Sequence, residues 1–379
     1  MSVSVERSDL SVLHIGAGRY KPGDTHHSTF DIWRELAKGF RRYTVVGRSY
    51  QNSFSRMEEG NLAVCLLPSY FASEAEFLFS QAKAIKIGEE VNADIVVAQC
   101  PVKGGLAGIE LSRRRGAKLL SELHGFEYFA AARIGSSQWS IQFMTGYPLK
   151  HSQRIRALSE GMKRRIIARY GTELESKIVC LPPRVDLKRF NYVKQDWAIQ
   201  MRPKLLMVGA VNENKGQRRL VSILLSARID VEIWIVGDGP DLQIVRKIAE
   251  NLGGADRVKF LGRLAHTDLA RLLPQADVFV MFSQSEGTPR AIMEGMAAGL
   301  PIITTNAGFC ADVVENGVQG FVLGDDPTAE IVQCLERLLG DDELRARMGQ
   351  AARARAEAEF DADKLYERYR ALIRETAEA

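Results

Sequence analysis

Two glutamates, Glu286 and Glu294, stand in the stretch VFVMFSQSEGTPRAIMEGMAAGLPIITTN of residues 278–306. A carboxylate accepts hydrogen bonds from ligand hydroxyls, such as those of a sugar or a ribose. Thr288 and Pro289, between the glutamates, predict a helix N-cap and a first helical residue. The exposed N–H groups of a helix N-terminus, with the positive end of the helix dipole, form a site for phosphate. This stretch therefore predicts a site for a ligand that carries phosphate and hydroxyl groups.

The elements that position these residues form one strand–helix–strand unit. Residues 278–282 and 301–305 are short apolar runs of the kind that pack in a parallel sheet. Glu294 lies on a mostly apolar helix, where an unpaired charge is costly, so it must meet a polar partner. That partner is either a ligand or Arg290, and in the second case Glu286 would face solvent.

The run EGTPRAIMEGMAAGLPII, residues 286–303, resembles the signature of the retaining glycosyltransferases of family 4, which have the GT-B fold. The resemblance implies that this run binds a nucleotide sugar. Glu294 would accept the ribose hydroxyls, and Glu286, as a catalytic residue, would hold hydroxyls of the transferred sugar. The backbone N–H groups of Arg290 and Ala291 would hold the diphosphate. The same substrate-binding turn would include Gly287, Thr288 and Pro289.

Lys215 lies in the run KLLMVGAVNENKGQ of residues 204–217. The resemblance implies a catalytic contact between this lysine and the donor diphosphate, and a solvent-facing lysine is the alternative. The family usually has an arginine five residues earlier, where this chain has Ala210. The loss of an arginine contact to a diphosphate costs roughly 1.5–3 kcal/mol. The missing charge could come from Arg218, Arg219 or Arg290.

The first half opens with residues 11–18, SVLHIGAG, which predict a short strand that ends in glycines. A GxG pair is weak evidence for a dinucleotide site but predicts a tight turn near a ligand, and the resemblance implies substrate binding at Gly16 and Gly18.

His124 follows the predicted strand of residues 118–123, at the edge where parallel sheets bind ligands. A lone histidine is more often structural, but the resemblance implies a catalytic position near the reacting sugar.

Strands and helices alternate in both halves, which predicts mainly parallel sheets. The first half also predicts strands at residues 43–46, 62–67 and 95–98, and helices at residues 30–40 and 74–88. The second half predicts strands at residues 204–209, 232–237, 258–262 and 320–323, a helix at residues 267–273 and a helical tail at residues 342–379. By the resemblance, the substrate-binding residues Gly262 and Arg263 belong to the segment that holds the nucleotide base.

These elements predict an α/β fold of two Rossmann-like, doubly wound domains that face each other across a cleft. By the resemblance, residues 1–186 would form the N-terminal acceptor domain and residues 187–359 the C-terminal nucleotide-sugar domain. A helix of residues 360–379 would pack back on the first domain. The family's linker ending PNGVD is altered here to PPRVD, residues 182–186.

The whole chain has 379 residues, of which 46% are apolar and 26% are charged, as is typical of a globular protein of two or three domains. No apolar run of about eighteen residues and no signal-peptide core are present. The five cysteines form no C-x-x-C pair. We therefore expect reduced thiols and a cytoplasmic location. No bound metal is expected, and no cofactor besides the nucleotide sugar as co-substrate.

Charge is divided unevenly along the chain. Residues 1–200 carry 29 Lys and Arg against 20 Asp and Glu, a net charge of +9, whereas the remainder carries a net charge of −5. A basic half favours an anionic partner, for which nucleic acid, a membrane surface and a phosphorylated lipid are candidates, and a solvated basic face is the alternative. With the resemblance, we expect no nucleic acid and a place in the cytoplasm or at the inner face of the cell membrane.

The predicted function is that of a retaining, metal-independent hexosyltransferase. It would move a sugar from a nucleotide-diphosphate sugar to a saccharide or lipid-linked saccharide in cell-surface polysaccharide synthesis. Two other classes stay open, because a fold does not fix a function. One is a sugar-nucleotide epimerase or phosphorylase of the same fold, and the other is a non-catalytic nucleotide-sugar binder, with which Ala210 would be consistent.

Overall fold

The structure is a computed structural model that describes residues 7–24, 28–69, 80–125, 137–199, 201–287, 289–324 and 326–379. The chain divides into two compact units. The first unit comprises Met1–Leu181 and Leu365–Ala379, and the second comprises Pro182–Lys364. In the described part of the chain, no helix has the length and apolar character needed to cross a bilayer.

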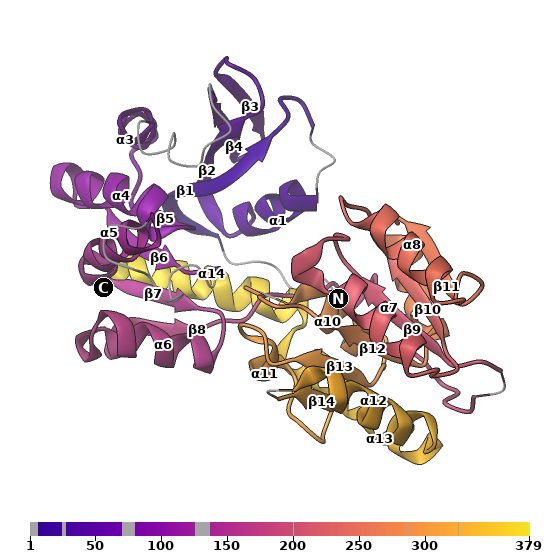
Figure 1. Ribbon diagram of the computed structural model, residues 1–379. Helices are drawn as coiled ribbons and strands as arrows, with labels where there is room; N and C mark the ends of the chain where they lie inside the picture. The colour runs from indigo at the N-terminus through magenta and orange to yellow at the C-terminus, as the bar shows by residue number, and fades with distance from the viewer. Residues whose placement is uncertain are drawn as a thin grey trace. The chain divides into compact units, whose positions relative to one another are not determined.

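The first unit is built on an eight-stranded sheet in the order β3-β4-β2-β1-β5-β6-β7-β8 (Figure 1). Neighbouring strands pair in parallel except β3, which is antiparallel to β4. The strand order reverses between β1 and β5, and ligands of open α/β sheets bind at such a reversal. The strands are β1 (Ser8–Tyr20), β2 (Phe40–Ser49), β3 (Ser55–Glu59), β4 (Leu62–Leu67), β5 (Ile95–Ala98), β6 (Lys118–Glu122), β7 (Arg154–Ala157) and β8 (Ile178–Cys180).

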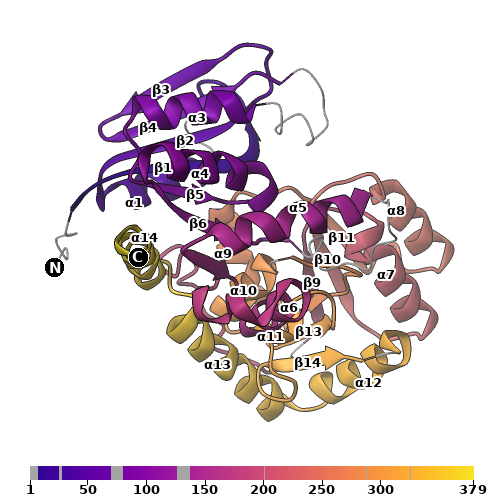
Figure 2. The ribbon, with the colours of Figure 1, turned by 90° about the vertical axis from the view of Figure 1, so that its left-hand side faces the viewer.

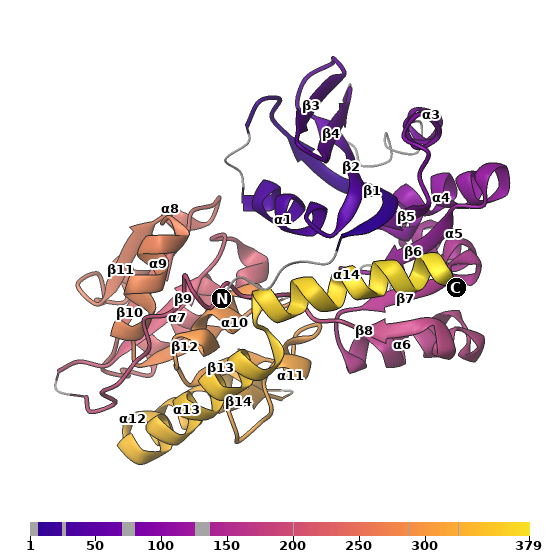
Figure 3. The ribbon, with the colours of Figure 1, turned by 180° about the vertical axis from the view of Figure 1, so that it is seen from behind.

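Helices cover both faces of this sheet. On one face, Val12 and Val45 pack with α1 (Ser28–Ala37) and α14 (Ala362–Glu378), which lie side by side (Figures 2 and 3). On the opposite face, Leu13 packs with α3 (Gln81–Glu90) and α4 (Pro101–Arg115). Val12 and Leu13 are adjacent in a strand, and successive strand residues point to opposite faces. The unit is completed by α5 (Ser137–His151), α6 (Glu160–Tyr170) and the 3-10 turn η1 (Thr172–Lys177).

The second unit is built on a six-stranded sheet in the order β11-β10-β9-β12-β13-β14, in which all neighbours pair in parallel. The chain runs outward from β9 to β11 and then returns to the other side of β9 as β12. The strand order therefore reverses between β9 and β12, which marks their carboxyl ends as a binding edge. The strands are β9 (Lys204–Val208), β10 (Glu232–Val236), β11 (Val258–Gly262), β12 (Val278–Met281), β13 (Ile302–Thr305) and β14 (Gly320–Leu323).

Helices also cover both faces of the second sheet. One face packs against α7 (Gln217–Ser226), α8 (Leu242–Asn251) and α12 (Pro327–Leu339). The other face packs against α9 (His266–Leu272), α10 (Arg290–Ala297) and α11 (Cys310–Val313). The long helix α13 (Asp342–Glu359) contributes to both cores, with Leu344 and Met348 in the first and Ala352 and Ala356 in the second. The 3-10 turn η3 (Leu273–Gln275) follows α9.

The two-part α/β fold with mainly parallel sheets is confirmed, but the first strand differs from its prediction. Residues 11–18 were expected to end in a turn, whereas β1 continues to Tyr20. Its register is irregular between Ile15 and Arg19, the segment that contains Gly16 and Gly18. The glycines bend a strand instead of ending it, because glycine is tolerated at such irregularities. Neither the β3–β4 hairpin nor α4 follows from the predicted pattern.

Helix boundaries differ as well. The helix predicted at residues 30–40 ends at Ala37, because Phe40 already begins β2, where it is fully buried. Of the helix predicted at residues 74–88, the part before residue 80 lies outside the described residues, and α3 extends to Glu90.

The helical tail predicted at residues 342–379 consists of two helices, α13 and α14, and α14 corresponds to the helix predicted at residues 360–379. Between them, Phe360 O accepts a hydrogen bond from Val185 N at 2.8 Å, and Ala362 N donates to Val185 O at 3.0 Å. These bonds occupy backbone groups that a continuous helix would have paired internally. The interruption is therefore part of the fold of the second unit.

Glycines end three neighbouring strands of the second sheet. Gly209 and Gly237 follow β9 and β10, Gly262 is the last residue of β11, and all three have positive φ angles, of 147°, 134° and 67°. Gly237 N donates to Gly262 O at 2.7 Å. A Cβ atom on Gly237 would lie only 1.8 Å from Gly209 O. Only glycine permits this approach, so the backbones that follow β9 and β10 come into close contact beside the strand reversal.

We predict that Gly237→Ala lowers the free energy of unfolding of the second unit by about 3 kcal/mol or more, because the new Cβ meets a backbone oxygen at a strained φ. Gly253→Ala is the matched control. Gly253 has a φ of 65° and no atom within 4 Å of an added Cβ, so only the conformational cost of about 1–2 kcal/mol remains. Urea denaturation compares the two variants, and equal losses would contradict the packing explanation.

Candidate functional site

The loops that follow β9 and β12 meet through an ion pair. Lys215 ends the short 3-10 turn η2 (Glu213–Lys215) after β9, and Glu286 lies in the loop after β12. Lys215 Nζ lies 2.5 Å from Glu286 Oε1, and the two side chains are 24% and 6% exposed. The structure therefore brings together two residues predicted to be catalytic, at the point where the strand order reverses.

Hydrogen bonds hold both loops. Asn214 Nδ2 donates to Ser285 O at 3.0 Å, and Asn214 Oδ1 accepts from Ser285 N at 3.0 Å. From β13, Thr305 Oγ1 donates to Ser283 O at 2.5 Å. The sequence pattern does not reveal these partners, although an asparagine in a turn commonly bonds to backbone groups. The segment that carries Glu286 is thus fixed by the loop after β9 and by β13.

The ion pair links the roles predicted for its two residues. The sequence predicts that Lys215 binds a diphosphate and that Glu286 binds sugar hydroxyls. The alternative, a solvent-facing Glu286, is wrong because its side chain is 6% exposed. An ammonium group has three N–H donors, so Lys215 can hold Glu286 and still donate to a diphosphate. The second oxygen of Glu286 likewise remains for a hydroxyl.

Glu294 is a nearly buried carboxyl on α10. Its side chain is 17% exposed, and it lies between the buried residues Met293 and Gly295. Burial raises the pKa of Glu294 to about 7, and the positive charges of Arg290 and Arg189 only partly oppose this rise. A carboxyl with this pKa is protonated about half of the time at neutral pH.

Few groups of the described chain are placed to pair with Glu294. Its Oε1 lies 3.9 Å from His266 Nε2. Partial burial and the charges of Arg189 and Arg290 lower the pKa of His266, so the imidazole is neutral at pH 7. Among the described residues, no ion pair within 4.0 Å joins Glu294 to Arg290, which was the alternative partner. The hydroxyls of a ligand would meet a desolvated acceptor here.

In the first unit, a buried carboxylate holds His124. His124 Nε2 lies 3.0 Å from Glu122 Oε2, and the Glu122 side chain is 1% exposed. The other oxygen of Glu122 accepts from Arg156 Nη1 at 3.2 Å and from the Tyr369 hydroxyl. Burial alone would raise the pKa of Glu122, but Arg156 and His124 hold it well below its usual range.

The contact with Glu122 determines which ring nitrogen of His124 is available to a ligand. An ionised carboxylate accepts a hydrogen bond from the ring N–H that it faces, so Nε2 carries the proton and Nδ1 is the nitrogen turned away from Glu122. The sequence contains a signal for this contact that the prediction did not use. Glu122 and His124 are two residues apart at the end of β6, and a period of two places them on the same side of a strand.

The glycines and the arginine predicted to bind substrate lie in two different units, Gly16 and Gly18 within a strand and Gly262 and Arg263 at a strand end. Gly16 and Gly18 belong to β1 of the first unit, and a Cβ atom on Gly16 would lie 2.9 Å from Gln99 Oε1. In the second unit, Arg263 follows Gly262 and is 81% exposed, with its Nε 3.8 Å from Asp238 Oδ2.

The predicted start of α10 is wrong by one residue. Pro289 caps the helix instead of starting it, because its ψ of 64° is not helical, and the helix begins with Arg290 and Ala291. Gly287 precedes this turn, and Thr288, the predicted cap, lies outside the described residues. Within the described ranges, no three side chains of His, Cys, Asp or Glu are arranged to hold a metal ion.

Two protein families match this chain. Residues 25–189 match the family described as Glycosyltransferase Family 4, and residues 191–355 match the family described as Glycosyl transferases group 1. His124 lies inside the first match, and Lys215, Glu286 and Glu294 lie inside the second.

The individual proteins that are similar to this chain have low sequence identity to it. The N-acetyl-alpha-D-glucosaminyl L-malate synthase of Bacillus anthracis is 23% identical over 301 residues, which cover 77% of each chain. A GDP-mannose-dependent alpha-(1-6)-phosphatidylinositol monomannoside mannosyltransferase of Mycobacterium tuberculosis is 31% identical over 202 residues, 49% of this chain and about half of the relative (52%). The structure of Anabaena Alr3699/HepE in complex with UDP-glucose aligns with a TM-score of 0.72 at 19% identity, covering 97% of this chain and 99% of that one. The shared fold is GT-B.

We predict that Glu294→Gln stabilises the second unit, and more so at high pH. Because the folded-state pKa of Glu294 is raised to about 7, its contribution to stability is complete below about pH 4.5 and is lost as pH rises to about 7. Glutamine cannot ionise. The variant's gain in free energy of unfolding should therefore be about 2–3 kcal/mol larger at pH 8 than at pH 5.

Urea denaturation at both pH values measures this gain. Glu250→Gln, at an exposed position of α8, is the matched control and should show little pH dependence. A gain for Glu294→Gln that is the same at pH 5 and pH 8 would contradict the desolvation of Glu294.

Proposed function

Since this chain is built from a glycosyltransferase family 4 domain and a glycosyl transferases group 1 domain, we propose that it transfers a sugar from a nucleoside diphosphate sugar to an acceptor hydroxyl. The observation that carries the proposal is the Lys215–Glu286 pair at the strand reversal, in the unit whose α10 bears Glu294. A cation, a helix N-terminus and two carboxylates suit a ligand with a diphosphate and several hydroxyls.

In this proposal, each group of the donor has its own partner. The diphosphate binds Lys215 and the N–H groups of Arg290 and Ala291, the ribose hydroxyls bind Glu294, and the transferred sugar binds Glu286. Negative charge grows on the diphosphate as its bond to the sugar breaks, and fixed donors stabilise that charge. We propose a metal-independent reaction, because a lysine and a helix N-terminus supply positive charge at the leaving group.

Retention of the anomeric configuration is part of the proposal and is supported by the likeness of residues 286–303 to the signature of retaining enzymes. His124, oriented by Glu122, would contact the reacting sugar with Nδ1.

The donor class is a nucleoside diphosphate hexose. Support comes from the UDP-glucose complex of the Anabaena protein and from the GDP-mannose dependence of the mycobacterial relative.

For the acceptor we propose a saccharide or lipid-linked saccharide of a cell-surface glycan, reached at the inner face of the membrane. The phosphatidylinositol mannoside in the name of the mycobacterial relative supports a lipid acceptor. Arg164, Arg165 and Arg169 are exposed on α6, whereas Arg113 of α4 is paired with Glu110. Binding to anionic but not neutral vesicles, lost at high salt, would support this position. Equal binding to both vesicle types would contradict it.

A panel of labelled nucleoside diphosphate sugars, each with and without saccharide and lipid-linked acceptors, tests the function. A new glycosidic product that depends on both substrates supports a transferase. Conversion of the donor without an acceptor would indicate an epimerase, and phosphate-dependent cleavage of a glycan would indicate a phosphorylase. Binding without any product would indicate a non-catalytic binder.

Nucleoside diphosphate alone should distinguish the two glutamates. We predict that Glu294→Ala weakens the binding of the nucleoside diphosphate at pH 8 by about 1–3 kcal/mol, as for a lost charged hydrogen bond to the ribose. Glu286→Ala should leave the affinity unchanged or raise it, because it frees an N–H of Lys215 for the phosphates. Isothermal titration calorimetry provides the measurement, and equal weakening by both variants would contradict the assigned roles.

Ala210 offers a test of the phosphate site. Ala210 is exposed after β9, and both arginines close in sequence have contacts of their own elsewhere. Arg218 Nη1 lies 3.7 Å from Asp241 Oδ2, and Arg219 Nη2 donates to Phe282 O at 2.9 Å. We predict that Ala210→Arg raises the affinity for a nucleoside diphosphate sugar roughly tenfold, because a guanidinium binds a diphosphate through two parallel hydrogen bonds.

Calorimetry of Ala210→Arg is compared with that of Lys215→Ala, which should lose affinity. A loss in both variants would mean that the phosphate site is already complete without the arginine.

A further inference from the structure

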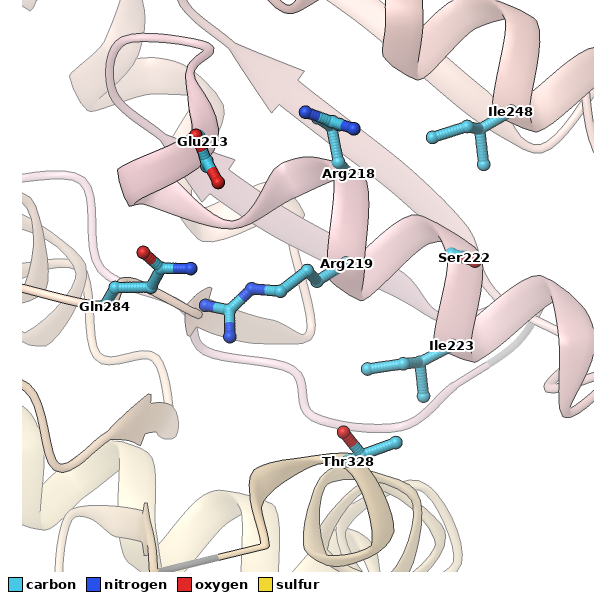
Figure 4. Close-up of a pocket in the computed structure, with 8 residues that line it drawn as sticks. All are labelled: Glu213, Arg218, Arg219, Ser222, Ile223, Ile248, Gln284 and Thr328. Carbon is cyan, nitrogen blue, oxygen red and sulfur yellow. The ribbon is translucent and has the colours of Figure 1, made fainter.

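A cavity of about 430 Å³ lies against α7, apart from the residues assigned to the donor. It is lined by the first turns of α7, by Ile248 of α8, by Thr328 of α12 and by Gln284 in the loop after β12 (Figure 4). Neither Lys215, Glu286 nor Glu294 is among its described lining residues. Small-molecule sites in proteins measure roughly 300–1,000 Å³, so this cavity is large enough to hold one.

Arg219 is the cation at the centre of this cavity. Its Nη2 donates to Phe282 O at 2.9 Å, and its guanidinium carbon lies 5.0 Å from the centre of the Phe282 ring. Within the described chain, no carboxylate forms an ion pair with it, and its buried Nε has no acceptor. The Nη1 group forms no hydrogen bond with the described residues, so the guanidinium has donors and a positive charge that an anion in the cavity can meet.

Other donors face the same space. The Gln284 amide points towards the Arg219 guanidinium, and the Thr328 hydroxyl points into the cavity from α12 (Figure 4). Arg218, on the other side of the same helix, adds a second cation near Asp241, at 3.7 Å. The cavity therefore collects hydrogen-bond donors from three separate elements of the second unit.

The remaining lining fits a small organic ligand. Ile223 and Ile248 supply apolar wall beside the arginines. Glu213 is the acid of the lining, but it is exposed, so water and salt screen its charge. The N-terminal N–H groups of α12 are not counted here, because Asp326 already accepts from Thr328 N and Ala329 N.

We propose that this cavity binds a phosphorylated small molecule of the size of a sugar phosphate, with the phosphate held by Arg219 and Gln284. A guanidinium can bind a phosphate group through two parallel hydrogen bonds, which are stronger than hydrogen bonds between neutral groups. The carbon frame of the ligand lies against Ile223 and Ile248. This binding does not depend on the function proposed above.

The cavity shares a loop with the Lys215–Glu286 pair. Gln284 stands two residues before Glu286, and Gln284 N donates to the carbonyl oxygen of Asn214, the neighbour of Lys215, at 2.8 Å. A ligand that binds Gln284 therefore contacts the loop that positions Glu286 for its ion pair with Lys215. Any effect of the phosphate on nucleotide binding must be matched by an equal effect of the nucleotide on phosphate binding.

Calorimetric titration of the intact protein with glucose 6-phosphate, at constant ionic strength, tests the proposal. We expect saturable binding below about 10 mM, no binding of glucose, and a loss of roughly tenfold or more in Arg219→Gln. Gln284→Ala, a change at an exposed position, should weaken binding as well and serves if Arg219→Gln does not fold. Arg347→Gln removes one exposed positive charge from α13 and is the matched control, with unchanged affinity expected.

Lys215→Ala identifies the site that is occupied. Retention of glucose 6-phosphate binding in Lys215→Ala, together with its loss in Arg219→Gln, supports the cavity. Loss in Lys215→Ala with retention in Arg219→Gln would assign the phosphate to the diphosphate site and overturn the proposal. Absence of saturable binding to the unsubstituted protein would overturn it too.

Discussion

The ion pair between Lys215 and Glu286 is the contact on which the arrangement of the second unit's binding edge depends. It joins the loops after β9 and β12, the two strands between which the sheet reverses its order. The Asn214–Ser285 bonds and the Thr305–Ser283 bond fix the same loops from either side. The glycines that follow β9 and β10 let the backbones of these strands approach closely at the neighbouring edge. The diphosphate site proposed above lies where these loops meet.

Two buried glutamates show how surroundings decide the chemistry of one residue type. Glu122 is paired with Arg156 and His124, which hold its pKa well below its usual range, so it is a permanent anion that orients a histidine. Glu294 lacks such a partner among the described residues, and burial raises its pKa to about 7. The first carboxylate is part of the framework of its unit. The second is kept desolvated at a cost in stability, as is common for residues that meet a ligand.

Much of the fold, and part of the candidate site, could be predicted from local sequence. Short apolar runs predict β4 and β5 at their observed bounds, because a buried parallel strand has a short, continuous apolar pattern. The bounds predicted for β11 and β14 are also those observed. Glu286 and Glu294 were predicted from the likeness of residues 286–303 to a family signature, and Lys215 from the separate run of residues 204–217. The ion pair could not be predicted in this way, since Lys215 and Glu286 are far apart in sequence and meet only through the strand order. The same holds for Tyr369 and Glu122, and for the cavity at Arg219, whose walls come from segments far apart in sequence, among them α7, α8 and α12.

Helix α14 gives the first unit an unusual order of assembly. Leu365, Tyr369, Leu372 and Ile373 belong to the same core as Val12, Phe30 and Trp33, and the Tyr369 hydroxyl bonds to Glu122. A ribosome synthesises the strands of this unit first, but it adds these four core residues only after the whole of the second unit. Domains generally fold as units, and the N-terminal one folds first during synthesis. Here the unit that emerges first must wait with part of its core uncovered, so the second unit can complete its core before the first.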